Sequence, residues 1–239
     1  MTQIKGFLET SFVDWPGKIA SVIFLPYCNF RCPYCHNHGI VLNPDKYETI
    51  PIEYVLTRLN EFTGWIDGVC ITGGEPTLHP SLPEFIRKFR VQNFLIKLDT
   101  NGTNPNVLRN LISNKLIDYV SMDVKAPLDE IRYSKCAGVP VNLTDIRESI
   151  SLLKGGTVPY EFRVTVVPGL LKEDDIIELA KQLARADKLT IQNFNPSDPL
   201  DSELKHVKPY NEGELKRIQD RVSKVLQTPN PQPTTLHLI

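Results

Sequence analysis

The 239-residue sequence lacks the features that would direct it to a membrane or to nucleic acid. It has no run of about 18 apolar residues, the length that a transmembrane helix needs, so we expect no membrane span. No long apolar run follows Met1, so we also expect no signal peptide. The formal net charge is only -1, which gives no general attraction to nucleic acid or anionic lipid. These absences predict a cytoplasmic protein that binds neither nucleic acid nor membrane.

The sequence also lacks the even, dispersed set of cysteines that is typical of a disulfide framework. Its five cysteines are an odd number, and three of them, Cys28, Cys32 and Cys35, fall within eight residues. Cysteines crowded in this way in a cytoplasmic chain favour a metal or redox centre. Cys70 lies in a predicted buried strand and Cys136 in a predicted long connection, and we interpret both as structural.

What the sequence does contain is a regular alternation of strand-like and helix-like segments. Strands rich in Val, Ile, Leu and Phe are predicted at residues 20–25, 68–72, 94–100, 117–124, 160–167 and 188–194. Helices are predicted between and after them at residues 52–62, 82–91, 106–113, 143–153, 173–186 and 211–226. This alternation predicts parallel strands joined by right-handed helical crossovers.

Six such units predict an α/β fold of the partial (β/α)6, TIM-like barrel type, two units short of a closed barrel. A flat doubly wound sheet is the alternative, and periodicity alone does not choose between the two. Both architectures place functional groups at the carboxyl ends of the strands. We expect one domain over residues 1–227, followed by a loose, Pro- and Thr-rich tail at 228–239. Residues 126–141 and 195–210 are predicted to be long connections.

The crowded cysteines follow the first predicted strand with the spacing C-x3-C-x2-C. Thiolates are soft ligands that suit iron–sulfur clusters, zinc or Cu(I). A [4Fe–4S] cluster used only for electron transfer normally takes four cysteines, so three would leave one iron open, as in a catalytic centre. From spacing alone, a structural zinc site completed by His36 or His38 remains an alternative, and it would make the protein a non-catalytic binding module. A four-cysteine centre would need Cys70 or Cys136.

Polar groups gather where the other predicted strands end. These exits are Gly73-Gly74-Glu75-Pro76, Asp99-Thr100-Asn101-Gly102, Asp123-Val124-Lys125, the strand carrying Arg163, and Gln192-Asn193-Phe194-Asn195. Paired glycines allow a ligand to approach the backbone closely. One exit alone is explained by a helix cap or a solvated charge, but several together predict a ring of groups around one pocket. Aspartate and lysine can bind ribose hydroxyls, an ammonium group or a carboxylate, so the ring suits a zwitterionic nucleoside.

On these residues the sequence resembles the radical S-adenosylmethionine (SAM) superfamily. The cysteine triplet, with Tyr34 as the aromatic residue, matches the C-x3-C-x-aromatic-C motif of that superfamily, and residues 73–76 match its GGEP motif. The resemblance covers residues 12 to about 194. A more specific resemblance, to one subgroup of the superfamily, rests on the segment F-V-D-W-P-G-K at 12–18 together with His36 and Asn37. These features are similar to those of activating proteins of anaerobic ribonucleoside-triphosphate reductases, which are glycyl-radical-enzyme activases.

The resemblance implies a radical SAM fold and a reaction. Cys28, Cys32 and Cys35 would bind three irons of a [4Fe–4S] cluster, and SAM would chelate the fourth. An electron from the cluster would cleave SAM into methionine and a 5′-deoxyadenosyl radical, which would take a hydrogen atom from a glycine of a partner enzyme. The implied partners are an anaerobic ribonucleotide reductase and a flavodoxin- or ferredoxin-type electron donor. No catalytic residue is expected beyond the cluster and the cofactor. A radical SAM enzyme that acts on a small molecule is the alternative.

The resemblance also implies which residues contact the cofactor. Glu75 and the paired glycines would hold the methionyl amine, Tyr34 would contact adenine, and Asp123 and Lys125 would bind ribose or carboxylate. The complete expected set is Tyr34, His36, Gly73, Gly74, Glu75, Asp99, Asn101, Asp123, Val124 and Lys125.

Three further expectations concern the surroundings of the cofactor. Asp99, Thr100 and Asp123 would frame a monovalent-cation site. Some activases carry a histidine after the sixth strand, where this sequence has Asn195. Tyr27 stands before the first cysteine, where glycine is common in the family, and it would reshape the loop without disturbing ligation.

Overall fold

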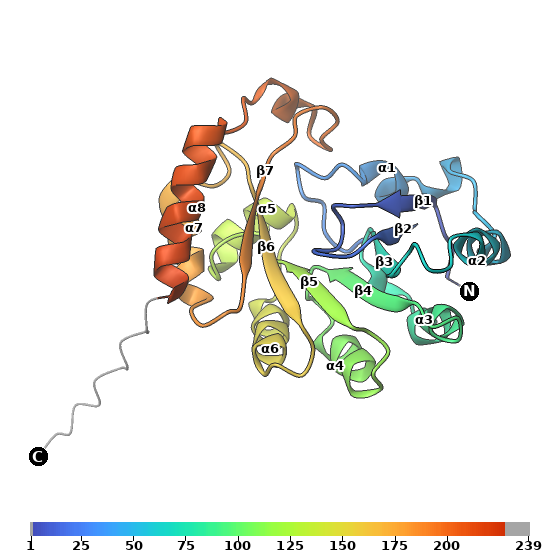
Figure 1. Ribbon diagram of the computed structural model, residues 1–239. Helices are drawn as coiled ribbons and strands as arrows, with labels where there is room; N and C mark the ends of the chain where they lie inside the picture. The colour runs from blue at the N-terminus through green and yellow to red at the C-terminus, as the bar shows by residue number, and fades with distance from the viewer. Residues whose placement is uncertain (1, 228–239) are drawn as a thin grey trace, which may run out of the picture.

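The computed structural model describes residues 2–227 and is built around one seven-stranded sheet (Figure 1). The strands follow one another across the sheet in chain order. They are β1 (Gly6–Ser11), β2 (Ala20–Leu25), β3 (Gly68–Gly73), β4 (Leu95–Thr100), β5 (Tyr119–Asp123), β6 (Tyr160–Val166) and β7 (Leu189–Asn193). β1 pairs antiparallel with β2, and every other neighbouring pair is parallel.

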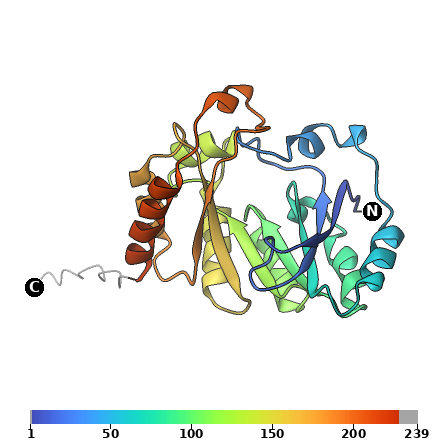
Figure 2. The same ribbon diagram turned by 45° about the horizontal axis from the view of Figure 1, so that its top comes forward.

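The strand order decides between the two architectures that the sequence allowed. A doubly wound sheet reverses its strand order at a switch point, whereas this sheet runs from β1 to β7 without reversal. The six predicted parallel strands are confirmed as β2 to β7, and they curve into a partial TIM-like barrel (Figure 2). β1 was not predicted, because this edge strand keeps five of its six residues at least partly exposed and gives a weak hydrophobic pattern.

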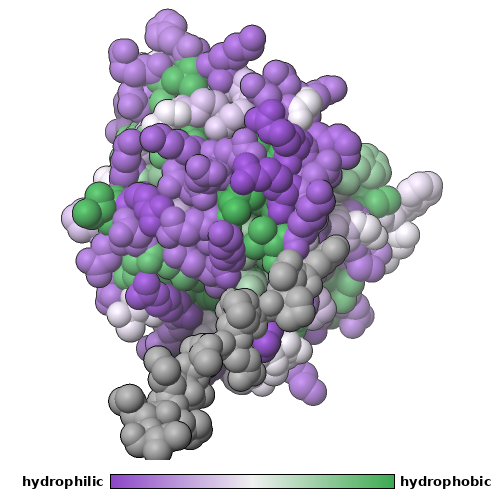
Figure 3. All heavy atoms as spheres, turned by 90° about the vertical axis from the view of Figure 1, so that its left-hand side faces the viewer, coloured by the Kyte–Doolittle hydropathy of each residue, from purple (hydrophilic) through white to green (hydrophobic). Residues whose placement is uncertain are grey.

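The six predicted helices are also confirmed, with shifts at their ends. They are α2 (Ile52–Glu61), α3 (Leu82–Arg90), α4 (Pro105–Ser113), α6 (Leu143–Lys154), α7 (Glu173–Gln182) and α8 (Glu212–Gln227). Each helix from α2 to α7 buries one stripe of apolar side chains; in α3 the stripe is Leu82, Phe85, Ile86 and Phe89. α8 packs beside α7, and the face around this pair is mainly hydrophilic (Figure 3).

Two α-helices were not predicted, and one of them corrects a prediction. α1 (His38–Leu42) follows the cysteine loop, and α5 (Glu130–Ala137) lies within the stretch that was expected to be a long connection. Cys136 therefore lies on a helix rather than in a loop, and it is buried. Three short 3-10 helices complete the elements: η1 (Pro44–Lys46), η2 (Pro76–Leu78) and η3 (Ser202–His206).

Two sequence predictions concern the chain as a whole. None of the helices within residues 2–227 is long and apolar enough to cross a membrane. The expected tail at 228–239 lies outside the described residues, and the division into a single domain at 1–227 stays a prediction.

Candidate active site

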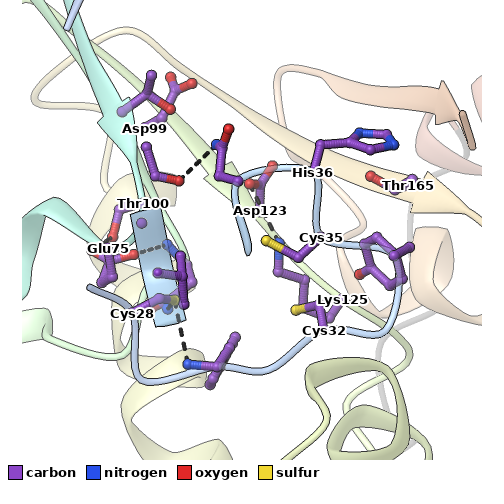
Figure 4. A pocket seen from close by; sticks show the side chains of 18 of the residues that line it. Cys28, Cys32, Cys35, His36, Glu75, Asp99, Thr100, Asp123, Lys125 and Thr165 are labelled. Carbon is purple, nitrogen blue, oxygen red and sulfur yellow. Dashed lines mark hydrogen bonds and ion pairs between the residues drawn. The ribbon is translucent and has the colours of Figure 1, made fainter. Parts of the chain in front are cut away.

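A cavity of about 270 Å³ lies at the carboxyl ends of the parallel strands, and the cysteine loop at residues 26–37 runs along one side of it (Figure 4). The cavity is lined by twelve of the thirteen residues predicted from the sequence: Cys28, Cys32, Tyr34, Cys35, His36, Gly73, Gly74, Glu75, Asp99, Asn101, Asp123 and Lys125. Segments nearly 100 residues apart in the chain are thus brought to one place, as parallel strands with a common polarity require.

Val124 is the one predicted residue that does not line the cavity. Its side chain is fully buried, and its N–H donates to the carbonyl of Arg163 at 2.8 Å. Successive residues of an extended chain point to opposite faces, so Asp123 and Lys125 face the cavity while Val124 points into the core. A contact between Val124 and the cofactor therefore stays a prediction.

The cysteine loop is held by backbone contacts from several elements. Tyr27 has φ of 63°, a left-handed conformation that glycine adopts without strain, so the backbone keeps a glycine-like geometry at this position. The Tyr27 carbonyl accepts the Glu75 N–H at 2.7 Å, and the Arg31 N–H donates to the Ala137 carbonyl at 2.8 Å. A Cβ at Gly74 would collide with the Tyr27 carbonyl oxygen, so this glycine is needed for close packing against the loop.

The three thiols have few partners within the protein. Cys28 Sγ accepts the Phe30 N–H at 3.3 Å and lies 3.8 Å from Asn101 Nδ2. Figure 4 shows Cys28 on the side of Glu75, and Cys32 and Cys35 on the side of Lys125. Burial is the main cause that raises the pKa of Cys28 to about 12, and it also raises the pKa values of Cys32 and Cys35. A bound metal centre would lower these pKa values, because its positive charge stabilises thiolates.

The arrangement of the possible ligand side chains can be compared with what a single metal ion requires. No group of three or more His, Cys, Asp or Glu side chains within residues 2–227 is arranged to hold one ion. The structural-zinc alternative requires such a group, so the geometry does not support it. An iron–sulfur cluster is larger than one ion and is bound by thiolates that are set further apart.

Glu75 is buried and joins the exits of β3 and β4. Its Oε1 accepts the Thr77 N–H at 3.0 Å, the Thr77 hydroxyl at 2.5 Å and the Thr100 hydroxyl at 2.7 Å. Within the described part of the chain, its Oε2 accepts one hydrogen bond, from the Asn101 N–H at 2.6 Å. Burial raises the pKa of Glu75 although these donors act to lower it. The Oε2 atom therefore has room for one more donor, whereas Oε1 has none.

A chain of alternating charges crosses the floor of the cavity. Arg163, on β6, lies 3.0 Å from Asp99 Oδ2 through Nη2 and 2.9 Å from Asp123 Oδ1 through Nε. Lys125 Nζ lies 3.4 Å from Asp123 Oδ2. Burial acts to raise the pKa of Asp123, but the charges of Arg163 and Lys125 outweigh it and hold this pKa at about 2. The Asp123 carboxylate is thus held in the charged form.

The segment after β7 lies over the cysteine loop. His36 Nε2 lies 2.7 Å from the Asn195 carbonyl oxygen, and His38 Nε2 lies 3.2 Å from Asp198 Oδ2. The Asp201 N–H donates to the Pro33 carbonyl at 2.8 Å. Asn195 therefore contacts His36 through its main chain.

The site also contains residues that were absent from the predicted set. Phe30, Asn37, Val41, Thr72, Thr100, Arg163, Thr165 and Gln192 all line the cavity as well. Arg163 and Thr165 are two residues apart on β6, so strand periodicity gives both the same face. That periodicity was the signal that could have added Thr165 once Arg163 had been noticed.

Comparison with known proteins decides the family. The model of the radical SAM superfamily matches residues 22–183, which include the cysteine loop and most of the barrel. The chain belongs to the radical SAM superfamily. A protein of Methanocaldococcus jannaschii named "Putative glycyl-radical enzyme activating enzyme" is 37% identical over 218 residues, which cover 90% of this chain and 89% of the relative. A second protein of that name from the same organism is 28% identical, over 77% of this chain and 70% of the relative.

Two solved structures have a similar fold. Streptococcus suis SuiB bound to S-adenosylmethionine superposes with a TM-score of 0.63 at 16% identity, covering 85% of this chain and 48% of SuiB. Escherichia coli coproporphyrinogen III oxidase, a radical SAM enzyme, gives a TM-score of 0.62 at 16% identity, covering 90% of this chain and 54% of the oxidase. At these identities the likeness concerns the fold alone.

Membership of the superfamily implies a [4Fe–4S] cluster and SAM, and the residues of the cavity fit both. Three thiols line it, and within the described residues they form no group with other His, Cys, Asp or Glu side chains that could hold a single metal ion. Tyr34 also lines the cavity, and its buried hydroxyl has no hydrogen-bond partner among the described residues. A buried hydroxyl of this kind is expected to find a partner, which a polar ligand can supply.

The residues do not fit the monovalent cation that the resemblance implied. The Arg163 guanidinium occupies the position between Asp99 and Asp123 where the cation was expected. The Thr100 hydroxyl is also engaged, because it donates to Glu75.

Proposed function

We propose that this protein binds a [4Fe–4S] cluster through Cys28, Cys32 and Cys35 and uses it to cleave SAM reductively, generating a glycyl radical on a partner enzyme. The observation that carries the proposal is the meeting of three thiols with a ring of polar groups in one cavity. When bound, the cluster supplies the electron that splits SAM into methionine and a 5′-deoxyadenosyl radical. The 37% identical relative supports the activase assignment.

The residues around the thiols would bind and orient the cofactor. Gly73 has φ of 110°, and its carbonyl accepts the Asn37 side-chain amide at 2.8 Å, so the direction of this carbonyl is fixed. This carbonyl and the free lone pair of Glu75 Oε2 would receive the methionyl ammonium group. Tyr34 would contact adenine. Fixed donors and acceptors of this kind position a reacting group without reorganising during the reaction.

The cationic side of the cavity would bind the anionic part of the cofactor. Lys125 is held by Asp123 in a fixed position, and its ammonium group faces the cavity. A carboxylate or a ribose hydroxyl would accept a hydrogen bond from it. Phe30 and Val41 provide apolar surface in the same cavity, which would help to keep water away from a reactive radical.

The proposed partner is an anaerobic ribonucleoside-triphosphate reductase, with a flavodoxin- or ferredoxin-type protein as electron donor. The segment at 12–18, which narrowed the resemblance, does not line the cavity. Trp15 is buried against Tyr119 with ring centroids 6.2 Å apart, whereas Phe12 and Val13 are exposed. We therefore expect this segment to contact the partner enzyme or to stabilise the fold, and not to contact the cofactor.

One anaerobic experiment tests the activase function. The holoenzyme, SAM, a chemical reductant and the candidate reductase are mixed, and the electron paramagnetic resonance (EPR) spectrum is recorded. The proposal predicts a glycyl radical signal on the reductase together with 5′-deoxyadenosine. A reductase whose target glycine is replaced by alanine is the control and should show no such signal.

The rival is a radical SAM enzyme that acts on a small molecule. A specific observation favours it to a lesser degree: a "Probable GTP 3',8-cyclase" of Pyrococcus horikoshii is 28% identical, over 64% of this chain and 48% of the cyclase. The same experiment separates the two. Formation of 5′-deoxyadenosine on a small substrate, with no glycyl radical on any candidate reductase, would favour the rival.

A further inference from the structure

Arg163 lies between two carboxylates at the base of the cavity. Its guanidinium contacts Asp99 Oδ2 through Nη2 at 3.0 Å and Asp123 Oδ1 through Nε at 2.9 Å. Only 13% of the Arg163 side chain is exposed. A guanidinium is a planar fork with several fixed N–H directions, so one arginine can serve two carboxylates at once.

Every carboxylate oxygen at this place is paired with a cationic nitrogen of the protein. Lys97 pairs with Asp99 Oδ1, and Arg163 pairs with Asp99 Oδ2. Arg163 also pairs with Asp123 Oδ1, while Lys125 pairs with Asp123 Oδ2. Each oxygen keeps a second lone pair, so an added metal ion would have to bind directly beside the cationic nitrogen that is already paired with that oxygen.

The third oxygen ligand expected for a cation is also engaged. The Thr100 hydroxyl donates to Glu75 Oε1 at 2.7 Å and accepts the Gly102 N–H at 3.1 Å. Its hydrogen is therefore committed to Glu75, and one of its two lone pairs is used.

Cationic groups of the protein already occupy this place. Lys97, Arg163 and Lys125 contribute three positive charges, set against the carboxyl groups of Asp99, Asp123 and the nearby Glu75. A further cation beside the Arg163 guanidinium would be repelled, since nearby buried charges are screened only weakly. The side of the cavity that carries Arg163 and Lys125 is suited to the carboxylate of an amino-acid-like ligand.

We propose that Arg163 is the built-in cation of this site, so that the protein binds SAM without a monovalent metal ion. Arg163 would hold Asp99 and Asp123 in place and contribute positive charge beside the cofactor carboxylate. This inference rests on the proposed function for the identity of the cofactor. The exclusion of a metal ion rests on the cationic nitrogens beside the two carboxylates, and it does not depend on the identity of the cofactor.

Direct ion binding tests the exclusion without any catalysis. The full-length holoprotein is dialysed to equilibrium against rubidium ion, a potassium mimic, with and without SAM. The proposal predicts no stoichiometric rubidium in either case. One tightly bound rubidium per chain in either case would overturn it. The result does not depend on whether the protein cleaves SAM, so a failure of the proposed function would be recognised separately by the absence of 5′-deoxyadenosine.

A variant tests the role of Arg163 itself. The dissociation constant for SAM is measured by calorimetry in buffers whose only cation is potassium or the bulky tetramethylammonium ion. We expect less than about a twofold difference for the unmodified protein. Arg163→Ala should weaken binding roughly tenfold or more in tetramethylammonium, because two buried carboxylates lose their partner. Potassium or guanidinium ion should restore part of that affinity by entering the vacated space.

Controls keep this experiment decisive. Arg109→Ala removes an arginine that pairs with Glu148 on the surface, and it should leave SAM affinity unchanged in both buffers. If Arg163→Ala does not fold, Arg163→Lys retains the charge but can serve only one carboxylate well, and it should show a smaller loss of the same kind. Loss of affinity that neither potassium nor guanidinium restores would reduce Arg163 to a structural support and overturn its role as the cation.

Discussion

The two sides of the cavity differ in how many of their polar groups have a partner within the protein. On one side, the thiols of Cys28, Cys32 and Cys35 have few protein partners, and burial makes their free thiolates unfavourable. On the other side, each carboxylate oxygen of Asp99 and Asp123 is paired with a lysine or an arginine. The thiol side is incomplete without a metal centre, whereas the carboxylate side is complete in the protein alone.

This difference teaches which parts of the site depend on a ligand for their stability. Removing a thiol should affect metal content much more than the fold, because the thiols lie in the loop after β2 and contribute only the small Cys32 side chain to the buried core. Removing a carboxylate or its partner should cost folding stability, because the remaining group is left buried and unpaired. The predictions below test this contrast in order of decreasing effect.

The largest effect is expected for a change at the thiol side. Cys32→Ala should abolish cluster binding and lower SAM cleavage by about a thousandfold or more, since no other ligand can take its place. The unfolding midpoint should change little. Iron and sulfide analysis, 5′-deoxyadenosine formation and thermal unfolding measure these three quantities.

Two other cysteines serve as controls for that variant. Cys70→Ala and Cys136→Ala remove buried thiols that do not line the cavity. Both variants should keep their iron and sulfide. Loss of the cluster from Cys136→Ala would contradict the assignment of three cysteine ligands.

The packing between the paired glycines and the cysteine loop is the next target. A Cβ at Gly73, where φ is 110°, would lie 2.5 Å from Leu25 backbone atoms. Gly73→Ala should lower the free energy of unfolding by about 3–5 kcal/mol, from the combined left-handed strain and overpacking, and it should lower iron retention. Gly169→Ala is the matched control. Its φ is also positive, at 89°, but no atom of the described residues lies within 4 Å of a Cβ added there. It should cost only about 1–2 kcal/mol.

A change at the Glu75 carboxylate is expected to have a smaller effect on stability. Glu75→Gln replaces an acceptor of four hydrogen bonds by a group with only one acceptor oxygen, so a buried donor loses its partner. We expect the free energy of unfolding, measured by urea titration, to fall by about 2–3 kcal/mol. Glu84→Gln removes an exposed carboxylate and should cost less than about 0.5 kcal/mol. Equal losses of unfolding free energy in Glu75→Gln and Glu84→Gln would contradict the expected difference between a buried, hydrogen-bonded carboxylate and an exposed one.

The smallest effect concerns acid stability. The pKa of Asp123 is about 2 in the folded protein, against an ordinary value of 3.8, so folding favours its carboxylate form. The stabilisation is therefore complete above pH 3.8 and is lost as the pH falls toward 2. Asp123→Asn should make the free energy of unfolding fall less steeply over this interval than in the unmodified protein. Equal slopes in urea titrations at successive pH values would contradict the pairing with Arg163 and Lys125.

Local patterns were enough to predict the parallel strands and most of the cavity. The strand exits share one polarity, so residues such as Glu75, Asp123 and Lys125 had to meet at one edge of the sheet. Val124 was predicted together with Asp123 and Lys125 as one motif, but its side chain is buried in the core, because alternate residues of an extended chain face opposite ways.

Other features depended on capping signals that were present but not used. α5 begins after Asp129, whose side chain accepts the Arg132 N–H at 2.9 Å, and it ends at Gly138 in the left-handed conformation. An acidic N-cap and a terminal glycine are ordinary helix boundaries. They could have revealed this helix within the expected connection.

Long-range pairs could not be predicted from the sequence. Arg163 stands directly opposite Asp123 in the β5–β6 register, and it also reaches Asp99 on β4. Which carboxylates an arginine joins depends on strand register and side-chain direction in the folded barrel. The contact between His36 and the Asn195 carbonyl likewise depends on how the segment after β7 folds back.

The most direct test of the account is EPR of the reduced, oxygen-free holoenzyme before and after addition of SAM. The account predicts about four irons and four sulfides per chain and a reduced-cluster signal that changes when SAM binds, because one iron has no protein ligand. A colourless protein with one zinc, or a cluster signal that SAM leaves unchanged, would contradict it.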